Sequence, residues 1–206
     1  MKLADARLYL CTPVRDAAFC EAVLGAGVDI IQLRDKHATD AELLGAARTF
    51  RAAADRHDAL FILNDRPDLA VECGADGVHL GQQDMYPADA RAIVGDERIV
   101  GRSTHSIEEL RRARDEPVDY IGVGPVHPTP TKPGRPGVGL GLVEAAAREA
   151  GLPWFVTGGM NVRTIAETAA AGARAFVVVR AITEATDPAA ATRDIRSAIE
   201  STAPGR

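Results

Sequence analysis

The sequence repeats one pattern from end to end: a short apolar run, a turn signal, and a helical stretch rich in alanine and charged residues. Eight apolar runs occur, at 8–11, 30–33, 60–63, 78–80, 99–101, 120–123, 154–156 and 176–179. Helical stretches lie near 16–26, 39–56, 66–73, 86–94, 106–115, 141–150, 161–171 and 187–201. Short apolar strands separated by helices indicate a parallel sheet covered by helices on both faces.

Eight such units favour closure of the sheet into an α/β fold of the (β/α)8 TIM barrel type. No composition shift marks a second domain, so we predict one domain over residues 1–206, with 201–206 frayed. The alternative is an open Rossmann-like sheet, which is disfavoured because no predicted strand is followed by G-x-G-x-x-G. Capping-box patterns at Thr39–Glu42 and Ser106–Glu109 support two of the helix starts.

Composition narrows the functional class. With one Trp, three Tyr and five Phe, the core is expected to consist of Ala, Val, Leu and Ile. A net charge of −5 argues against nucleic-acid or anionic-membrane partners. The chain has neither a signal-peptide pattern nor an 18-residue apolar run. Cys11, Cys20 and Cys73 lack C-x-x-C spacing and are predicted to be free thiols in a reducing cytoplasm.

In a TIM barrel the chemistry lies at the carboxyl ends of the strands. The second predicted strand ends in Gln32-Leu33-Arg34, and its period of two places Gln32 and Arg34 on one face. If Leu33 packs on the helices, then Arg34 enters the barrel mouth. A buried Arg is costly unless an anion meets it, so we expect a phosphorylated ligand there. The alternative is a salt bridge to Asp35 or another neighbouring acid.

Two acids follow neighbouring strands at the same end of the predicted barrel. Asp65 follows the third strand and Asp84 the fourth. Mg²⁺ prefers one or two carboxylates together with water and phosphate oxygens, which this pair can offer. Taken singly, either residue can instead be a helix N-cap.

The segment 119–137 contains five prolines and four glycines, and it is too long for an ordinary connection. Its prolines should hold it extended. Thr129, Thr131 and Lys132 present two hydroxyls and an ammonium, the groups that a phosphorylated ligand needs. The alternative is a solvated linker.

The remaining strand ends carry weaker signals. Ser103 can donate to a phosphate, although serines there are more often turn or cap residues. His105 is interpreted as structural rather than as a catalytic base, because the sequence assigns it no partner carboxylate. Gly158-Gly159 and the stretch 178–181 follow the last two strands, where barrels frequently bind phosphate through backbone N–H groups.

Together these residues resemble the thiamine phosphate synthase family. The matching segments, in the family's order and spacing, are QLRDK (32–36), NDRPDLAVECGADGVHLGQQD (64–84), GRSTH (101–105), DYIGVGPVHPTPTK (119–132), TGGMN (157–161) and GARAFVVVRAI (172–182). The resemblance implies a cytoplasmic Mg²⁺-dependent transferase with a (β/α)8 barrel. It joins a pyrimidine methyl diphosphate to a thiazole phosphate and releases pyrophosphate. The reaction is expected to be dissociative, with a pyrimidine methyl cation captured by the thiazole nitrogen.

The resemblance also assigns the site residues. Those implied for the pyrimidine diphosphate are Gln32, Leu33, Arg34, Asp35, Lys36, Asn64, Ser103 and Lys132. Those implied for the thiazole phosphate are Thr129, Pro130, Thr131, Gly159, Val179 and Arg180, and the Mg²⁺ ligands are Asp65 and Asp84. Lys132, Arg34 and Ser103 are expected to stabilise the departing diphosphate, with no side-chain nucleophile.

Two positions depart from the family pattern. Arg180 stands where a serine is common, and His127 stands where an apolar aromatic is usual. Thiazole tautomerase-like relatives share the barrel, but they place a histidine at the position of Pro125 and lack the acid pair. A non-catalytic barrel that senses a phosphorylated ligand is the other alternative. The exposed helices of such a barrel offer surfaces for a homo-oligomer.

Overall fold

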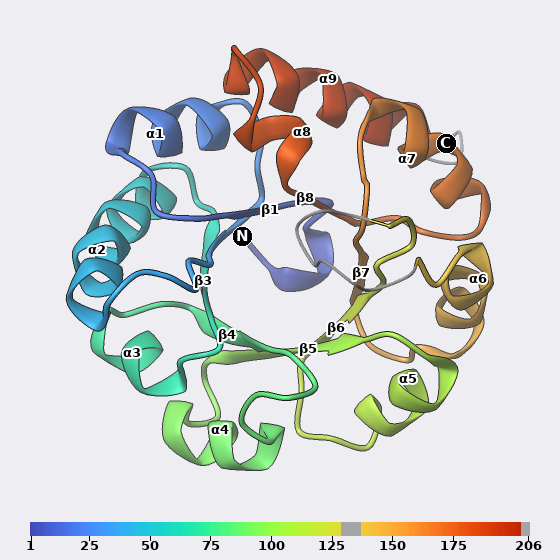
Figure 1. The fold of residues 1–206 in the computed structure, drawn as a ribbon, viewed down its shortest axis with the longest axis horizontal. Coiled ribbons are helices and arrows are strands. Elements are labelled where there is room, and N and C mark those ends of the chain that lie inside the picture. The colour runs from blue at the N-terminus through green and yellow to red at the C-terminus, as the bar shows by residue number, and fades with distance from the viewer. Residues whose placement is uncertain (129–136, 203–206) are drawn as a thin grey trace.

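The computed structural model describes residues 1–128 and 137–202, which form a closed barrel of eight parallel strands in sequence order, surrounded by helices (Figure 1). The strands are β1 (Leu8–Thr12), β2 (Ile30–Leu33), β3 (Leu60–Asn64), β4 (Gly77–Leu80), β5 (Ile99–Thr104), β6 (Tyr120–Val123), β7 (Trp154–Val156) and β8 (Phe176–Val178). The pairing of β1 with β8, which places Leu8 opposite Phe176, closes the ring. The predicted TIM barrel is therefore confirmed, and the open sheet is excluded.

A helix follows each strand. The helices of the described residues are α1 (Ala17–Gly25), α2 (Asp40–Arg56), α3 (Pro67–Glu72), α4 (Pro87–Val94), α5 (Ile107–Ala113), α6 (Leu140–Glu149), α7 (Val162–Ala170), α8 (Arg180–Thr183) and α9 (Pro188–Ser201), with a 3-10 turn η1 (Leu3–Asp5) before β1. The short helix α8 was not predicted, because four residues are too few to show a helical period. Arg180 therefore begins a helix instead of extending the last strand.

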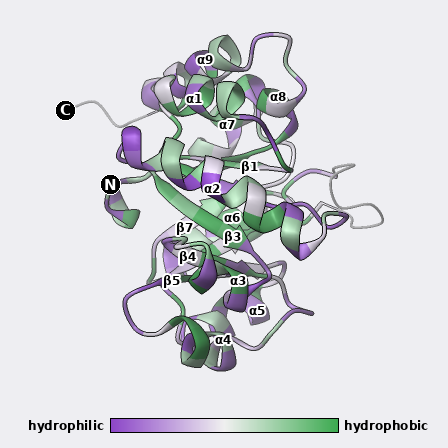
Figure 2. Cartoon of the chain, turned by 90° about the vertical axis from the view of Figure 1, so that its left-hand side faces the viewer, coloured by the Kyte–Doolittle hydropathy of each residue, from purple (hydrophilic) through white to green (hydrophobic). Residues whose placement is uncertain are grey.

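The two faces of each strand have different partners. Alternate side chains such as Leu10, Ile31 and Phe61 face outward and pack against the surrounding helices. The other set faces inward and forms one cluster inside the barrel: Ala6, Tyr9, Ile30, Ile62, Tyr120, Phe155 and Ala175. The hydrophobic colour of Figure 2 is concentrated on the central strands, while the hydrophilic colour gathers on the helices and loops around them.

Aromatic rings occupy the centre of the barrel, which the expectation of an aliphatic core did not anticipate. Tyr9, Tyr120 and Phe155 contact one another with ring centroids 5.4–6.0 Å apart. Gly101 makes room for them, since a Cβ at that position would lie 2.1 Å from Cζ of Tyr120. Leu3 of η1 packs against the same cluster, so the N-terminal turn, dark blue across the centre of Figure 1, covers one end of the barrel.

Helix starts follow the capping patterns in part. Thr39 and Glu42 form the predicted reciprocal capping box of α2. At α5, Ser106 accepts from the backbone N–H of Glu109, but the Glu109 carboxylate binds His105 and makes no return bond to Ser106. The second predicted capping box is therefore wrong in its reciprocal half, because the neighbouring histidine competes for the carboxylate.

An aspartate precedes each of the strands β2, β4 and β6, and its carboxylate accepts a backbone N–H at the start of the preceding strand. Each carboxylate also pairs with an arginine from a helix. The sets are Asp29 with Leu8 N–H and Arg196, Asp76 with Phe61 N–H and Arg51, and Asp119 with Val100 N–H and Arg91. These three Asp–Arg clamps fasten the amino-terminal rim of the barrel, opposite the end where chemistry is expected.

As predicted, no disulfide joins the cysteines in the described part of the chain: Cys11 and Cys20 are buried and Cys73 is partly buried. Within residues 1–128 and 137–202, no helix combines the length and the apolar character needed to cross a membrane.

The Asp29 clamp yields a stability prediction. The Asp29 carboxylate accepts from the backbone N–H groups of Arg7 and Leu8 at 2.7 and 2.9 Å, and from Arg196 at 2.8 Å. Asp29→Ala leaves these three donors without their acceptor. It is therefore expected to lower the free energy of unfolding by about 2–4 kcal/mol in urea denaturation. Asp194→Ala, at an exposed position on α9, is the control and should change it by less than about 0.5 kcal/mol. Equal effects of the two substitutions would contradict the clamp.

Candidate active site

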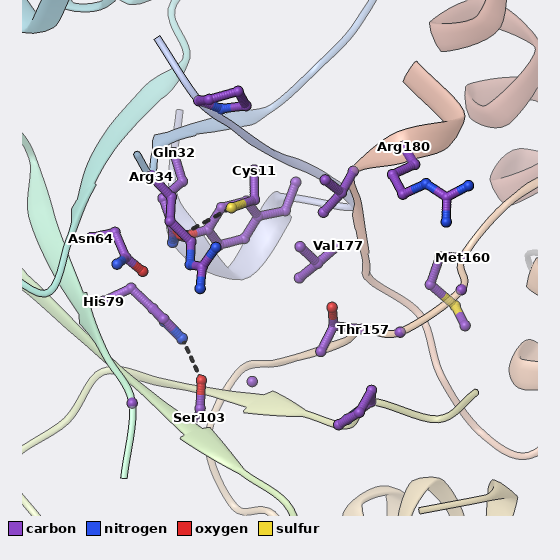
Figure 3. Close-up of a pocket in the computed structure, with 18 of the residues that line it drawn as sticks. Cys11, Gln32, Arg34, Asn64, His79, Ser103, Thr157, Met160, Val177 and Arg180 are labelled. Carbon is purple, nitrogen blue, oxygen red and sulfur yellow. Dashed lines mark hydrogen bonds between the residues drawn. The ribbon is translucent and has the colours of Figure 1, made fainter. Parts of the chain in front are cut away.

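A cavity of about 970 Å³ opens at the carboxyl ends of the strands, and side chains from β1–β6 and β8 line it together with the loop that follows β7. In Figure 3, Arg34, Asn64 and His79 lie on one side of this cavity, while Met160 and Arg180 lie on the other. The two sides therefore carry separate sets of polar and charged groups, one from β2–β5 and the residues just after them, and one from the segments that follow β7 and β8.

The end of β2 supplies the cation of the first side. Gln32 and Arg34 face the cavity, and Leu33 is fully buried in the outer core, as the period of two predicts. A contact of Leu33 with a ligand would therefore involve its backbone. Among the described residues the guanidinium of Arg34 forms no ion pair, and the segment 129–136 contains no acidic residue. The alternative of a salt bridge at Arg34 therefore lacks a partner in the part of the chain that the structure describes.

The next two residues have different surroundings. The Asp35 carboxylate accepts from the backbone N–H groups of Val14 and His37, at 3.4 and 3.1 Å, so it links the loops that follow β1 and β2. Lys36 extends over the rim, and its Nζ lies 3.4 Å from the Asp65 carboxylate. A positive charge thus lies beside the predicted acid pair.

Asp65 and Asp84 lie together at the rim between β3 and β4. Burial, followed by the neighbouring Asp84 carboxyl, raises the pKa of Asp65 above its ordinary value, while Lys36 opposes this shift. Asp84 accepts from the backbone N–H of Gly81 at 2.8 Å, which orients its carboxylate. Two adjacent carboxylates repel each other unless a proton or a cation lies between them.

The pair suits a hard divalent cation whose other ligands come from water and phosphate. Within the described residues, no cluster of three or more His, Cys, Asp or Glu side chains has the geometry of a metal site. A complete protein cage is therefore absent from that part of the chain. Mg²⁺ is usually bound by one or two carboxylates and substrate phosphates, so the residues present fit Mg²⁺.

A buried ion pair supports the loop that carries Asp84. Arg102 faces outward from β5, is 4% exposed, and donates to the carbonyl of Gly81 at 2.7 Å. Its Nε lies 3.6 Å from the carboxylate of Glu116, which is 8% exposed. Because Gly81 also donates to Asp84, the position of this carboxylate depends on a contact behind the barrel wall.

Ser103 and two histidines lie at the ends of β4 and β5. The Ser103 hydroxyl lies 2.8 Å from Nε2 of His79, and its backbone carbonyl accepts from the side chain of Gln82. Nδ1 of His105 lies 2.9 Å from the Glu109 carboxylate, which supplies the acidic partner that the sequence did not assign. This pairing favours the structural interpretation of His105.

The second side of the cavity contains the paired glycines after β7. A Cβ on Gly158 would lie 2.5 Å from Pro125, so close packing of the loop after β6 by itself requires a glycine there. His127 packs on Gly159 and places Nε2 3.0 Å from the Glu167 carboxylate on α7. The histidine thus fills space and also makes a polar contact that an apolar aromatic could not make.

Arg180 and Val179 complete this side. Val179 precedes α8 and lines the cavity. The Arg180 side chain is about half exposed, and its Nε lies 3.0 Å from both carboxylate oxygens of Glu184 one turn later. Glu184 lines the same cavity, so Arg180 also neutralises an acid beside the expected thiazole phosphate site.

Most of the predicted site residues therefore meet at one cavity. Those that line it are Gln32, Arg34, Asp35, Lys36, Asn64, Asp65, Asp84, Ser103, Gly159, Val179 and Arg180. Thr129, Pro130, Thr131 and Lys132 lie outside the described residues. Sequence reasoning missed Tyr9, His79 and Tyr120, which form the floor of the cavity. The alternation that placed Gln32 could have found His79, which lies between the outward-facing Val78 and Leu80.

Comparisons with known proteins agree with this architecture. The profile of the thiamine monophosphate synthase family matches residues 8–182. Thiamine-phosphate synthase of Acidothermus cellulolyticus is 49% identical over 98% of both chains. The enzyme of the same name from Thermobifida fusca is 50% identical over 95% of this chain and 93% of its own.

Solved structures show the same similarity. Thiamine phosphate pyrophosphorylase from Pyrococcus furiosus superimposes with a TM-score of 0.90 and 30% identity, covering 98% of this chain and 99% of the other. A 3-hexulose-6-phosphate synthase shares the fold, with a TM-score of 0.67 and 24% identity over 93% of this chain and 99% of its own. By the profile match and the near full-length identity to these relatives, the chain belongs to the thiamine monophosphate synthase family.

Proposed function

We propose that this chain is a thiamine phosphate synthase: a Mg²⁺-dependent transferase that joins a pyrimidine methyl diphosphate to a thiazole phosphate and releases pyrophosphate. The observation that carries the proposal is the half-buried Arg34, which has no acidic partner among the described residues and shares one cavity with the Asp65–Asp84 pair. A cation of this kind, in one cavity with two carboxylates suited to Mg²⁺, matches a diphosphate better than a neutral ligand.

The size and the two sides of the cavity suit two small phosphorylated molecules. Cavities that bind small molecules usually measure about 300–1,000 Å³, and this one lies at the upper end at about 970 Å³. We assign the pyrimidine diphosphate to the side of Arg34 and Asn64, and the thiazole phosphate to the side of Gly159 and Arg180. The pyrimidine methyl carbon that carries the diphosphate would then face the thiazole nitrogen across the centre of the cavity.

The protein's contribution to bond breaking is electrostatic. Negative charge grows on the diphosphate as its bond to the pyrimidine methyl carbon breaks. Arg34 and Lys36 would neutralise this charge, while Ser103 would donate a hydrogen bond to it. We assign Lys132 to the same diphosphate, and Thr129, Pro130 and Thr131 to the thiazole phosphate.

Asp65 and Asp84 would hold Mg²⁺ against the diphosphate oxygens. Bound there, Mg²⁺ would act as a Lewis acid that stabilises the negative charge of the leaving group. The two carboxylates also reject a diphosphate without its cation, because their charges would repel it.

Capture of the pyrimidine methyl cation needs positioning and no protein nucleophile. The loops after β7 and β8 would hold the thiazole phosphate through Gly159, Val179 and Arg180. Holding two reactants in contact can lower the barrier by about 7–11 kcal/mol. The net charge of −5 favours small-molecule substrates over nucleic acid or an anionic membrane as partners, and we place the reaction in the cytoplasm.

The first test is turnover. The protein, Mg²⁺ and both phosphorylated substrates should release pyrophosphate and form thiamine phosphate, and removal of the metal with a chelator should stop the release. A protein that binds both substrates without releasing pyrophosphate would overturn the proposal and favour a sensor of phosphorylated ligands. Asp84→Asn should reduce the release about 100-fold or more, because the remaining amide is a poor Mg²⁺ ligand.

The fold of this variant should survive, since the Asn carbonyl can still accept from Gly81. Asp89→Asn, at an exposed position on α4, is the matched control and should retain full activity. Normal release by Asp84→Asn would show that the metal assignment is wrong.

The second test concerns Arg180. Arg180→Ser is expected to keep turnover while raising the KM for the thiazole phosphate several-fold, because the substitution removes a cation and exposes the charge of Glu184 to the phosphate. The companion Arg180→Ser/Glu184→Gln should recover part of that affinity. Arg193→Ser on α9 is the control. A folded but inactive Arg180→Ser enzyme would contradict this role.

A further inference from the structure

A continuous chain of hydrogen bonds crosses the floor of the cavity. It begins at the Cys11 thiol, 3.2 Å from Oε1 of Gln32, and continues from Nε2 of Gln32 to the Tyr9 hydroxyl. The Tyr9 and Tyr120 hydroxyls lie 2.9 Å apart, and the Tyr120 hydroxyl lies 2.9 Å from Nδ1 of His79. The chain ends at Ser103, whose hydroxyl lies 2.8 Å from Nε2 of His79. Figure 3 shows its two ends, Cys11 with Gln32 and His79 with Ser103, as dashed contacts.

Two glycines of the barrel make room for the Tyr120 and His79 rings. Because Gly101 has no side chain, the Tyr120 ring can lie against its backbone. A Cβ on Gly122 would lie 3.3 Å from the His79 ring, so that glycine also keeps space for a ring. The His79 and Tyr120 rings stack with centroids 5.4 Å apart. Because these rings are confined, His79 contacts Tyr120 through Nδ1 and Ser103 through Nε2 at the same time.

The Gln32 amide gives the chain a direction. An amide nitrogen can only donate and an amide oxygen can only accept, so Gln32 donates to Tyr9 and accepts from Cys11. The contacts between the two hydroxyls and between Tyr120 and Nδ1 of His79 can run in either direction by themselves. If Tyr120 donated to Tyr9, the Tyr9 O–H would have no acceptor within this chain, so the arrangement that uses both hydroxyl protons runs from Tyr9 to Tyr120 to His79. A neutral imidazole that accepts at Nδ1 must donate at Nε2, so Ser103 accepts from the histidine.

Burial keeps the two tyrosines in the form that this direction requires. Both rings are almost completely excluded from solvent. Burial raises the pKa of Tyr9 and of Tyr120 well above the usual value, so both hydroxyls keep their protons at neutral pH. Each can therefore donate one hydrogen bond and accept another.

The direction of the chain determines where the Ser103 hydroxyl can donate. Its oxygen accepts from His79, so its own O–H cannot point back at the imidazole and is available to the cavity. Its backbone is held as well, since the Ser103 carbonyl accepts from Gln82 at 2.7 Å. Arg34 lines the same cavity as Ser103, so a diphosphate that reaches both would meet the guanidinium and a hydroxyl donor.

We infer that Tyr120 and His79 are positioning residues that hold the Ser103 hydroxyl as a hydrogen-bond donor toward a phosphate oxygen of the ligand. As a role in substrate binding, this inference rests on the proposed function. The direction of the chain is a separate property of the folded protein, and it can be measured without turnover.

The first experiment reads the state of His79 in the wild-type protein. The ring ¹⁵N chemical shifts of histidine distinguish a protonated from an unprotonated nitrogen, and the His79 signals are assigned by their loss in His79→Gln. At neutral pH, His79 is expected to carry its proton on Nε2 alone. A proton on Nδ1 alone, or on both nitrogens, would overturn the inference, because the chain would then run in the opposite direction or stop at the histidine.

Two matched variants test whether the Tyr120 hydroxyl determines which nitrogen of His79 carries the proton. Tyr120→Phe keeps the ring and removes the donor to Nδ1, so His79 should become a mixture of tautomers. Tyr9→Phe removes an equally buried hydroxyl but leaves Tyr120 as donor, so His79 should stay protonated on Nε2. Equal effects of the two variants would contradict the assigned role of Tyr120, and circular dichroism melting checks that both remain folded.

The second experiment is a double-mutant cycle, with inorganic pyrophosphate and Mg²⁺ as the probe in calorimetry. Ser103→Ala is expected to weaken pyrophosphate binding about 10-fold, and Tyr120→Phe about 2- to 10-fold. If Tyr120 acts through Ser103, Tyr120→Phe should cause no further loss in the Ser103→Ala background. The same loss in both backgrounds would overturn the inference. A folded protein with these binding results but no pyrophosphate release would overturn only the proposed function.

Discussion

Closure of the eight strands into one ring of backbone hydrogen bonds is the constraint on which the rest of this molecule depends. Once the ring is closed, every second side chain must face a narrow interior, and the barrel fills it with Tyr9, Tyr120 and Phe155. Above these rings the same inward positions carry polar groups. The cavity floor is therefore an extension of the core, and the hydroxyls of core tyrosines become part of the site.

The two ends of the ring meet different physical demands. At the amino-terminal rim, Asp29, Asp76 and Asp119 are satisfied by backbone N–H groups and arginines. At the opposite rim, Arg34 has no acidic partner among the described residues, and Asp65 has a raised pKa. Charges that are neutralised at the amino-terminal rim stabilise the fold, while the guanidinium of Arg34 and the Asp65–Asp84 pair at the other rim are available to a charged ligand and a cation.

Much of the fold could be predicted from the sequence, because apolar runs and helical stretches are local patterns. The same local rule placed Gln32 and Arg34 inside the barrel and Leu33 outside it. It could not reveal that Arg34 lacks a salt bridge in the described part of the chain, since that depends on which acids the closed ring brings near. Tyr120 sits in an apolar run and was therefore interpreted as core, although its hydroxyl reaches the cavity floor. The Asp–Arg clamps were missed because each joins residues far apart in the sequence, and α8 was missed because it is a single turn.

The clamp at Asp29 has a consequence for biosynthesis. Its guanidinium comes from Arg196 on the last helix, whereas the backbone groups that it holds lie at the start of the first strand. A nascent chain emerging from the ribosome cannot complete this contact until residue 196 has been translated. The first β-strand would therefore gain its arginine partner only after α9 has been translated, and a polypeptide that stops before residue 196 would leave the Asp29 carboxylate without that arginine.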